Sequence, residues 1–136
     1  MKKLRVEYLP NDNTIVKVCD GNVFNYVKKY CKKVNNIDNS TDSKLSILLL
    51  TSQESVIYAF RLAVSDGLIS PDDIEFSFTV PVPNLHVPNT HIIEVDNYGH
   101  CSEYPDGFAD FIDKINMKFL DNMFEDKIEM VYEEQS

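Results

Sequence analysis

A short apolar run followed at once by a helix start sets the plan of this chain. The run consists of Leu45, Ile47, Leu48, Leu49 and Leu50. Such a run is typical of a strand buried on both faces, at the centre of a sheet that helices cover. Thr51 and Glu54 then have the spacing of a capping box. The sequence therefore predicts a strand, a tight turn and a helix.

The residues after the turn continue this pattern. An apolar stripe at helical spacing predicts the helix, and it is made by Val56, Phe60, Ala63 and Val64. Gly67 suits the left-handed position that ends a helix, and Pro71 blocks any continuation. Ile74, Phe76 and Phe78 alternate with polar residues, which predicts a returning strand with one wetter face.

Four short motifs follow one another along this stretch. They are Thr51-Ser52-Gln53-Glu54, Asp66-Gly67-Leu68-Ile69-Ser70-Pro71-Asp72-Asp73, Asp96 with Gly99, and Tyr104-Pro105-Asp106-Gly107-Phe108. Their order resembles the C-terminal lobe of ABC-type AAA ATPases of the overcoming-lysogenization-defect, RecF and SMC-like class. The resemblance covers about half of the chain. It implies an α/β lobe, a bacterial or phage defence setting and an ABC-type ATPase as a protein partner.

The chain departs from this family at the residues that carry ATP chemistry. Ser52 stands where the family has a histidine that senses the γ-phosphate, and a serine cannot carry a positive charge near neutral pH. None of the four glycines is followed by Lys-Ser or Lys-Thr, so the sequence has no phosphate-binding P-loop. No apolar run leads into Asp-Glu. We therefore expect a degenerate switch turn at Thr51, Ser52, Gln53 and Glu54, with no catalytic residue, cofactor or metal.

Charge is distributed unevenly. Residues 1–33 hold eight Lys and Arg against three acids, whereas residues 34–136 hold five against nineteen, giving the net charge of −9. Most of the surface should therefore repel nucleic acid. If the protein contacts nucleic acid, we expect the lysines of the first helix to make that contact: Lys28, Lys29, Lys32 and Lys33. A solvated outer helix face is the alternative explanation of these lysines.

The remaining segments complete a predicted single-domain α/β sandwich, with a mixed sheet of about five strands and three helices. Residues 1–34 are predicted to form a β-hairpin, with its turn at Pro10–Asn13, and a basic helix capped by Asn22. Residues 35–43 read as a surface loop, 44–124 as the ATPase-like unit and 125–136 as an acidic tail, although alternation in the last segment also allows a strand. Asp106 is the expected N-cap of a last helix, whose apolar stripe is Phe108, Phe111, Ile112, Ile115, Phe119 and Met123.

Other reactive side chains each have a structural explanation beside a functional one. The histidines, His86, His91 and His100, lack the i, i+4 spacing of helical metal ligands. Two acidic pairs could hold a cation or cap helices: Asp72 with Asp73, and Asp106 with Asp110. Cys31 lies in an apolar stripe, which favours a buried, inert thiol over a nucleophile.

These observations leave two classes of function. The first is a non-catalytic interaction protein, a partner or regulator of an ABC-type ATPase; the second is a nucleic-acid-associated accessory protein that uses the basic helix. We expect a cytoplasmic protein without a membrane span, because the N-terminal apolar residues alternate with charges. The sequence leaves the identity of the partner and the oligomeric state open.

Overall fold

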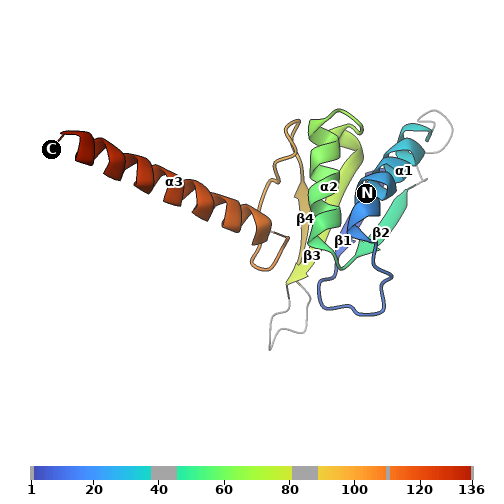
Figure 1. Ribbon diagram of the computed structural model, residues 1–136. Helices are drawn as coiled ribbons and strands as arrows, with labels where there is room; N and C mark the ends of the chain where they lie inside the picture. Colours follow the sequence, from blue (N-terminus) through green and yellow to red (C-terminus); the bar gives the residue numbers. More distant parts are fainter. Residues whose placement is uncertain (1, 38–45, 81–88, 110, 136) are drawn as a thin grey trace.

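Leu4, Val6 and Tyr8 alternate with charged residues, and this pattern forms β1 (Leu4–Tyr8), a central strand of the sheet. The computed structural model in Figure 1 describes residues 2–37, 46–80, 89–109 and 111–135; the side chains of residues 111 and 125–135 lie outside this description. Expectations for the segments 38–45 and 81–88, including His86, therefore fall outside the described residues.

The sheet has the strand order β2-β1-β3-β4. β1 pairs in parallel with both β2 (Ile47–Thr51) and β3 (Ile74–Val80), and β4 (Asn89–Glu94) pairs antiparallel to β3. The α/β class and the mixed sheet are confirmed. The described residues form four strands in one open sheet, rather than about five.

Three α-helices accompany the sheet: α1 (Val23–Asn35), α2 (Glu54–Ser65) and α3 (Phe111–Gln135). Short 3₁₀ turns at Asp20–Asn22 and Pro71–Asp73 precede α1 and β3. At the end of α2, Leu68 N–H donates to the Ala63 carbonyl and Gly67 N–H to the Val64 carbonyl. This is a Schellman ending with Gly67 at a positive φ of 77°, as the sequence predicted.

The apolar strand is not central. β2 lies at one edge of the sheet, and the outward-facing Leu48 and Leu50 are 53% and 44% exposed. The interpretation as a strand buried on both faces was wrong, because α1 and α2 cover only one face and leave the other without a helix among the described residues (Figure 1). A run of leucines does not distinguish a fully buried strand from an edge strand with an apolar outer face.

The predicted N-terminal hairpin is also wrong. Ile15–Val18 is not a strand, and Val16 is 90% exposed. Instead β1 pairs with two strands that come later in the sequence, β2 and β3. Directly after β1, Leu9 N–H donates to the Thr51 carbonyl at 2.7 Å. The turn-forming residues after β1 therefore start a long connection to α1 rather than a tight reversal.

One hydrophobic core lies between the sheet and the two helices. It joins the inward side chains of β1 and β3 to the buried stripes of α1 (Val23, Val27, Cys31, Val34) and α2 (Val56, Ile57, Ala59, Phe60, Ala63, Val64). Phe108, which is 1% exposed, closes the core at one end by contacting Tyr8, Phe76 and Phe78, with ring centroids 5.7–6.1 Å apart.

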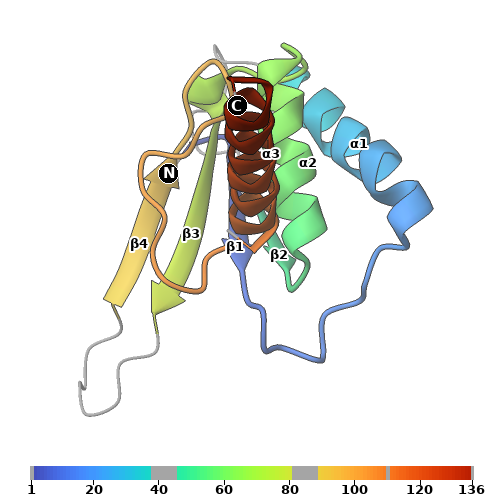
Figure 2. The same ribbon diagram turned by 60° about the vertical axis from the view of Figure 1, so that its left-hand side comes forward.

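The two connections between the parallel strands have opposite handedness. From β1 to β2 the chain crosses the sheet in one direction, and from β2 to β3 it crosses in the other. Nevertheless α1 and α2 pack side by side on the same face (Figure 2). Two crossovers of the same hand would place their helices on opposite faces, so one of the two βαβ units is left-handed, against the strong general preference.

The last helix departs most from expectation. Asp106 does not cap it, because Pro105–Phe108 forms a turn and α3 begins only at Phe111. From there α3 projects away from the body of the molecule (Figure 1), and Ile115, Phe119 and Met123 of the predicted core stripe are exposed. The helix continues to Gln135, so a strand over the last residues is excluded. No helix of the described residues is long and apolar enough to span a bilayer.

The position of Phe108 gives a test of this core. We expect Phe108→Ala to lower the free energy of unfolding by about 3–5 kcal/mol, because it leaves a cavity against three buried rings. Phe24→Ala on the exposed side of α1 is the matched control, and it should change stability by no more than about 0.5 kcal/mol. Urea denaturation measures both; equal effects would place Phe108 outside the core.

Candidate functional site

The turn Thr51–Glu54 connects β2 to α2, but it is not a capping box. Gln53 occupies the N-cap position of α2 and makes no side-chain capping bond. Thr51 is the last residue of β2, and its hydroxyl accepts a 3.1 Å hydrogen bond from Gln53 N–H. The prediction of reciprocal capping by Thr51 and Glu54 is therefore wrong, because Glu54 has another partner.

Gln53 fixes the long connection that follows β1. Its amide oxygen accepts from Val18 N–H at 2.7 Å, and its amide nitrogen donates to the Val18 carbonyl at 2.8 Å. This two-point bond imitates a pair of strand hydrogen bonds and satisfies both backbone groups of Val18. One side chain of the turn thereby holds a segment that has no regular structure of its own.

Glu54 fixes the start of α3. Its Oε1 accepts a 2.9 Å hydrogen bond from Ile112 N–H, one of the first amides of that helix. A carboxylate at a helix N-terminus is favourable because it satisfies an amide without an intrahelical partner and complements the helix dipole. The carboxylate expected to cap its own helix therefore caps another.

Ser52 is the remaining residue of the turn. Its Oγ is buried and has no hydrogen-bond partner among the described residues. A buried hydroxyl in this state has an unused capacity to donate or accept one hydrogen bond. Of the four predicted residues, three are engaged in structural bonds, whereas the Ser52 hydroxyl is unpaired and buried.

A second cluster, centred on Arg61 of α2, was not predicted from the sequence. Arg61 donates to the Gly99 carbonyl at 2.8 Å, to Asp113 Oδ2 at 2.9 Å and to the Tyr104 hydroxyl at 3.0 Å. Tyr58 also donates to Asp113, at 2.8 Å. This bond and burial raise the pKa of the Tyr58 hydroxyl, so it remains a donor at neutral pH. The cluster joins α2, the 96–104 segment and α3.

The motif Asp96 with Gly99 has a structural role in this cluster. Asp96 Oδ1 accepts from the backbone N–H groups of His100 and Tyr98 at 2.9 Å, and these bonds lower the pKa of the Asp96 carboxyl. Gly99 has a φ of 79°, and a Cβ there would collide with the Arg61 carbonyl. The glycine is thus required for close approach to α2, a signal that the sequence did contain.

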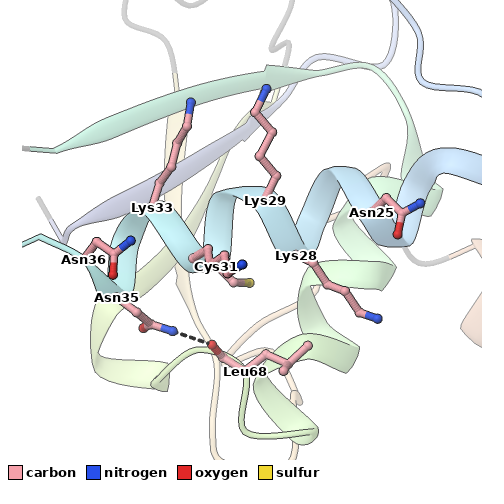
Figure 3. Close-up of a pocket in the computed structure, with 9 residues that line it drawn as sticks. Asn25, Lys28, Lys29, Cys31, Lys33, Asn35, Asn36 and Leu68 are labelled. Carbon is pink, nitrogen blue, oxygen red and sulfur yellow. Dashed lines mark hydrogen bonds between the residues drawn. The ribbon is translucent and has the colours of Figure 1, made fainter.

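The four lysines of α1 lie on its outer side, opposite the buried stripe, and all of them line one hollow. Lys29 and Lys33 extend to one side of the helix and Lys28 away from them (Figure 3), because neighbouring residues on a helix are about 100° apart. Lys29 and Lys33 also lie over the Tyr30 ring, at 5.5 and 5.0 Å from its centroid. A hollow of about 650 Å³ beside α1 is lined by the lysines and by Leu68, whose carbonyl accepts from Asn35 at 2.9 Å.

The other candidate residues have local partners. Burial raises the pKa of the Cys31 thiol to about 11, which makes the thiolate scarce at neutral pH, as expected of an inert cysteine. His91 lies 2.9 Å from Glu103, and Asp73 lies 3.7 Å from Lys3. Within the described ranges no three His, Cys, Asp or Glu side chains come together as metal ligands.

The uncovered side of the sheet is a third feature, and we call it the open face. It consists of the outward side chains of the four strands: Arg5, Glu7, Leu48, Leu50, Glu75, Ser77, Ile92 and Glu94. Leu48, Leu50 and Ile92 are 53%, 44% and 42% exposed. Between them Arg5 pairs with Glu75 at 3.3 Å, while Ser77 Oγ and Arg5 Nε are buried without a partner among the described residues.

Comparisons with protein-family models, with curated proteins and with solved structures found no match for this chain.

Substitutions in the turn should separate its structural residues from Ser52. We expect Gln53→Ala to cost about 1–3 kcal/mol of unfolding free energy, because it leaves both backbone groups of Val18 without their partner. Ser52→Ala removes only an unpaired hydroxyl, so it should stay within about 0.5 kcal/mol of the parent. Urea denaturation of both variants is the measurement; a large loss for Ser52→Ala would show that its hydroxyl already has a partner.

The Arg61 cluster gives a further test. Arg61→Met should lower the free energy of unfolding by about 2–4 kcal/mol, because the largely buried Asp113 and Gly99 groups lose a charged donor. Arg61→Lys keeps the charge but not the planar fork, so its loss should be intermediate. Equal stability of all three proteins in urea would contradict the assigned role.

Proposed function

We propose that this chain is a non-catalytic interaction protein that docks onto an ABC-type ATPase through the open face of its sheet. The observation that carries this proposal is the exposure of Leu48, Leu50 and Ile92 on that face. Leu48 and Leu50 lie on the edge strand β2, and Ile92 lies on the other edge strand, β4, with the polar side chains of β1 and β3 between them. Exposed apolar side chains that share one face of a sheet are characteristic of a protein-binding site.

The centre of the open face is closed to water by its own side chains. Arg5 pairs with Glu75 at 3.3 Å, and Ser77 Oγ and Arg5 Nε are buried without a partner among the described residues. A partner would therefore contact the exposed Leu48 and Leu50 beside Arg5 rather than these buried atoms.

The class of the partner follows from the order of the sequence motifs. The lobe that this chain resembles belongs to ATPases, and the sequence itself has neither a P-loop nor an acidic metal-binding motif. A lobe of this kind regulates or completes an ATPase carried on another chain. The nucleic-acid alternative has weaker support, because the net charge of −9 makes most of the surface repel a polyanion.

Binding to a candidate ABC-type ATPase tests the proposal. Calorimetry should detect a complex with the native chain, and Leu48→Asp with Leu50→Asp should abolish it by placing charges in the interface. Leu62→Asp on α2 is the matched control, because Leu62 is equally exposed at 44% but lies on the helical side of the sheet. The control should bind like the native chain.

The outcomes distinguish the site from the function. If the variant with Leu48→Asp and Leu50→Asp and the Leu62→Asp control lose binding equally, the open face is not the docking surface. In a confirmed complex, Ser52→Ala and Ser52→His report whether the turn reaches the ATP site, because only a residue at that site alters ATP turnover. Absence of any complex, together with salt-sensitive DNA binding that is lost when Lys28, Lys29, Lys32 and Lys33 become Ser, would favour the alternative.

A further inference from the structure

The edge strand β2 has hydrogen-bonding partners on one side only. At its two ends, Ile47 N–H and the Thr51 carbonyl each bond at 2.7 Å to a residue that flanks β1. Because the backbone groups of successive strand residues point to alternate sides, the N–H and carbonyl groups of Leu48 and Leu50 point away from β1. No hydrogen bond between described residues uses these outward groups.

The opposite edge of the sheet is closed by the chain itself. On β4, Glu94 N–H donates to Ser102 Oγ at 3.1 Å, and the Glu94 carbonyl accepts from Ser102 N–H at 2.8 Å. Proteins commonly protect a free edge with charged side chains, proline or a bulge. The β2 sequence, Ile-Leu-Leu-Leu-Thr, has no charge or proline, and its register with β1 has no bulge. The edge of β2 is therefore suited to pair with a further strand.

Helix α1 extends the helical layer toward this edge. It is the outermost helix on the β2 side of α2 in both Figure 1 and Figure 2. One flank of α1 is joined to the chain after α2, where Asn35 donates to the Leu68 carbonyl at 2.9 Å. Tyr26 and Tyr30 lie on the opposite flank, because successive helix residues are about 100° apart. Their rings are partly buried, with centroids 5.0 Å apart, and they offer an aromatic cover to a strand beside β2.

We propose that β2 pairs along this outer edge with one extended segment of the partner ATPase, which adds a fifth strand to the sheet. This inference rests on the proposed function and specifies how the partner binds beside Leu48 and Leu50. An added strand satisfies the outward backbone groups, which docking onto the face alone does not. Between the leucines on one side and the tyrosines on the other, the segment that fits is apolar and uncharged.

A second copy of this chain fits the edge less well than a single segment. Pairing β2 with its counterpart would bring the two α1 helices together over strands about 4.8 Å apart, whereas packed helices are roughly 8–10 Å apart. It would also bring together two sets of four lysines, whose charges repel. One extended segment has no helix and needs no charge.

Two substitutions at one position separate strand pairing from contact through side chains. Leu48→Pro removes the outward N–H, and its fold should persist because an edge strand tolerates proline where the N–H points outward. Leu48→Ala is the matched control, since it removes the same side chain and keeps the N–H. In calorimetry with a candidate ABC-type ATPase, we expect binding to weaken about 100-fold for Leu48→Pro and about ten-fold for Leu48→Ala. Circular dichroism checks the fold of both variants.

Amide hydrogen exchange of the native chain gives a measurement that needs no substitution. In the chain alone the Leu48 and Leu50 amides should exchange much faster than the Leu49 amide, and in the ATPase complex all three should exchange slowly. Fast exchange of Leu48 and Leu50 in the complex overturns strand pairing, whether or not Leu48→Pro folds. Slow exchange in the chain alone, at the mass of two chains, would identify a second copy as the occupant and also overturn it.

The outcomes for this inference and for the proposed function differ. Equal weakening by Leu48→Pro and Leu48→Ala, with the outward amides unprotected, overturns strand pairing and leaves docking through the open face in place. Absence of any complex overturns the proposed function and this inference together.

Discussion

Arg61 is the contact on which the C-terminal third of the structure depends. A single guanidinium on α2 holds the Gly99 carbonyl, the Tyr104 hydroxyl and the Asp113 carboxylate, all within 2.8–3.0 Å. Its planar set of donors can bind three acceptors at once, which an ammonium group on a flexible stem cannot do with the same precision. Through it the core of α2 and the sheet determines where α3 starts and in which direction it leaves.

Because helices cover the sheet on one side only, two sets of apolar side chains are exposed. Because α1 and α2 share a face, the outward residues of four strands have no helix over them among the described residues. α3 contacts α2 through its first turns, where Glu54, Tyr58 and Arg61 bond to it, and Phe119 and Met123 farther along are exposed. The same packing arrangement thus leaves apolar side chains exposed on a sheet face and on a helix.

Local elements were predictable from this sequence, but their partners were not. The stripes of α1 and α2, the alternation of β3 and the glycine ending of α2 all report burial and backbone conformation within one segment. The position of β2 at an edge, the parallel pairing of β1 and the exposure of Phe119 depend on contacts between distant segments. An apolar stripe indicates that one side of a helix avoids water, but it does not indicate which segment or molecule covers that side.

The same limit applies to the turn at Thr51–Glu54, which the sequence located correctly and assigned wrongly. The spacing predicts that Glu54 caps its own helix, whereas its carboxylate accepts a hydrogen bond from the start of α3, 58 residues later. The Gln53 side-chain amide is likewise hydrogen-bonded to the backbone of a distant residue, Val18. With these side chains engaged, a phosphate at this turn would have to break bonds that hold two segments in place. Ser52 alone among the four keeps an unused hydrogen bond, but its hydroxyl is buried, so a group from another molecule reaches it only if the turn moves.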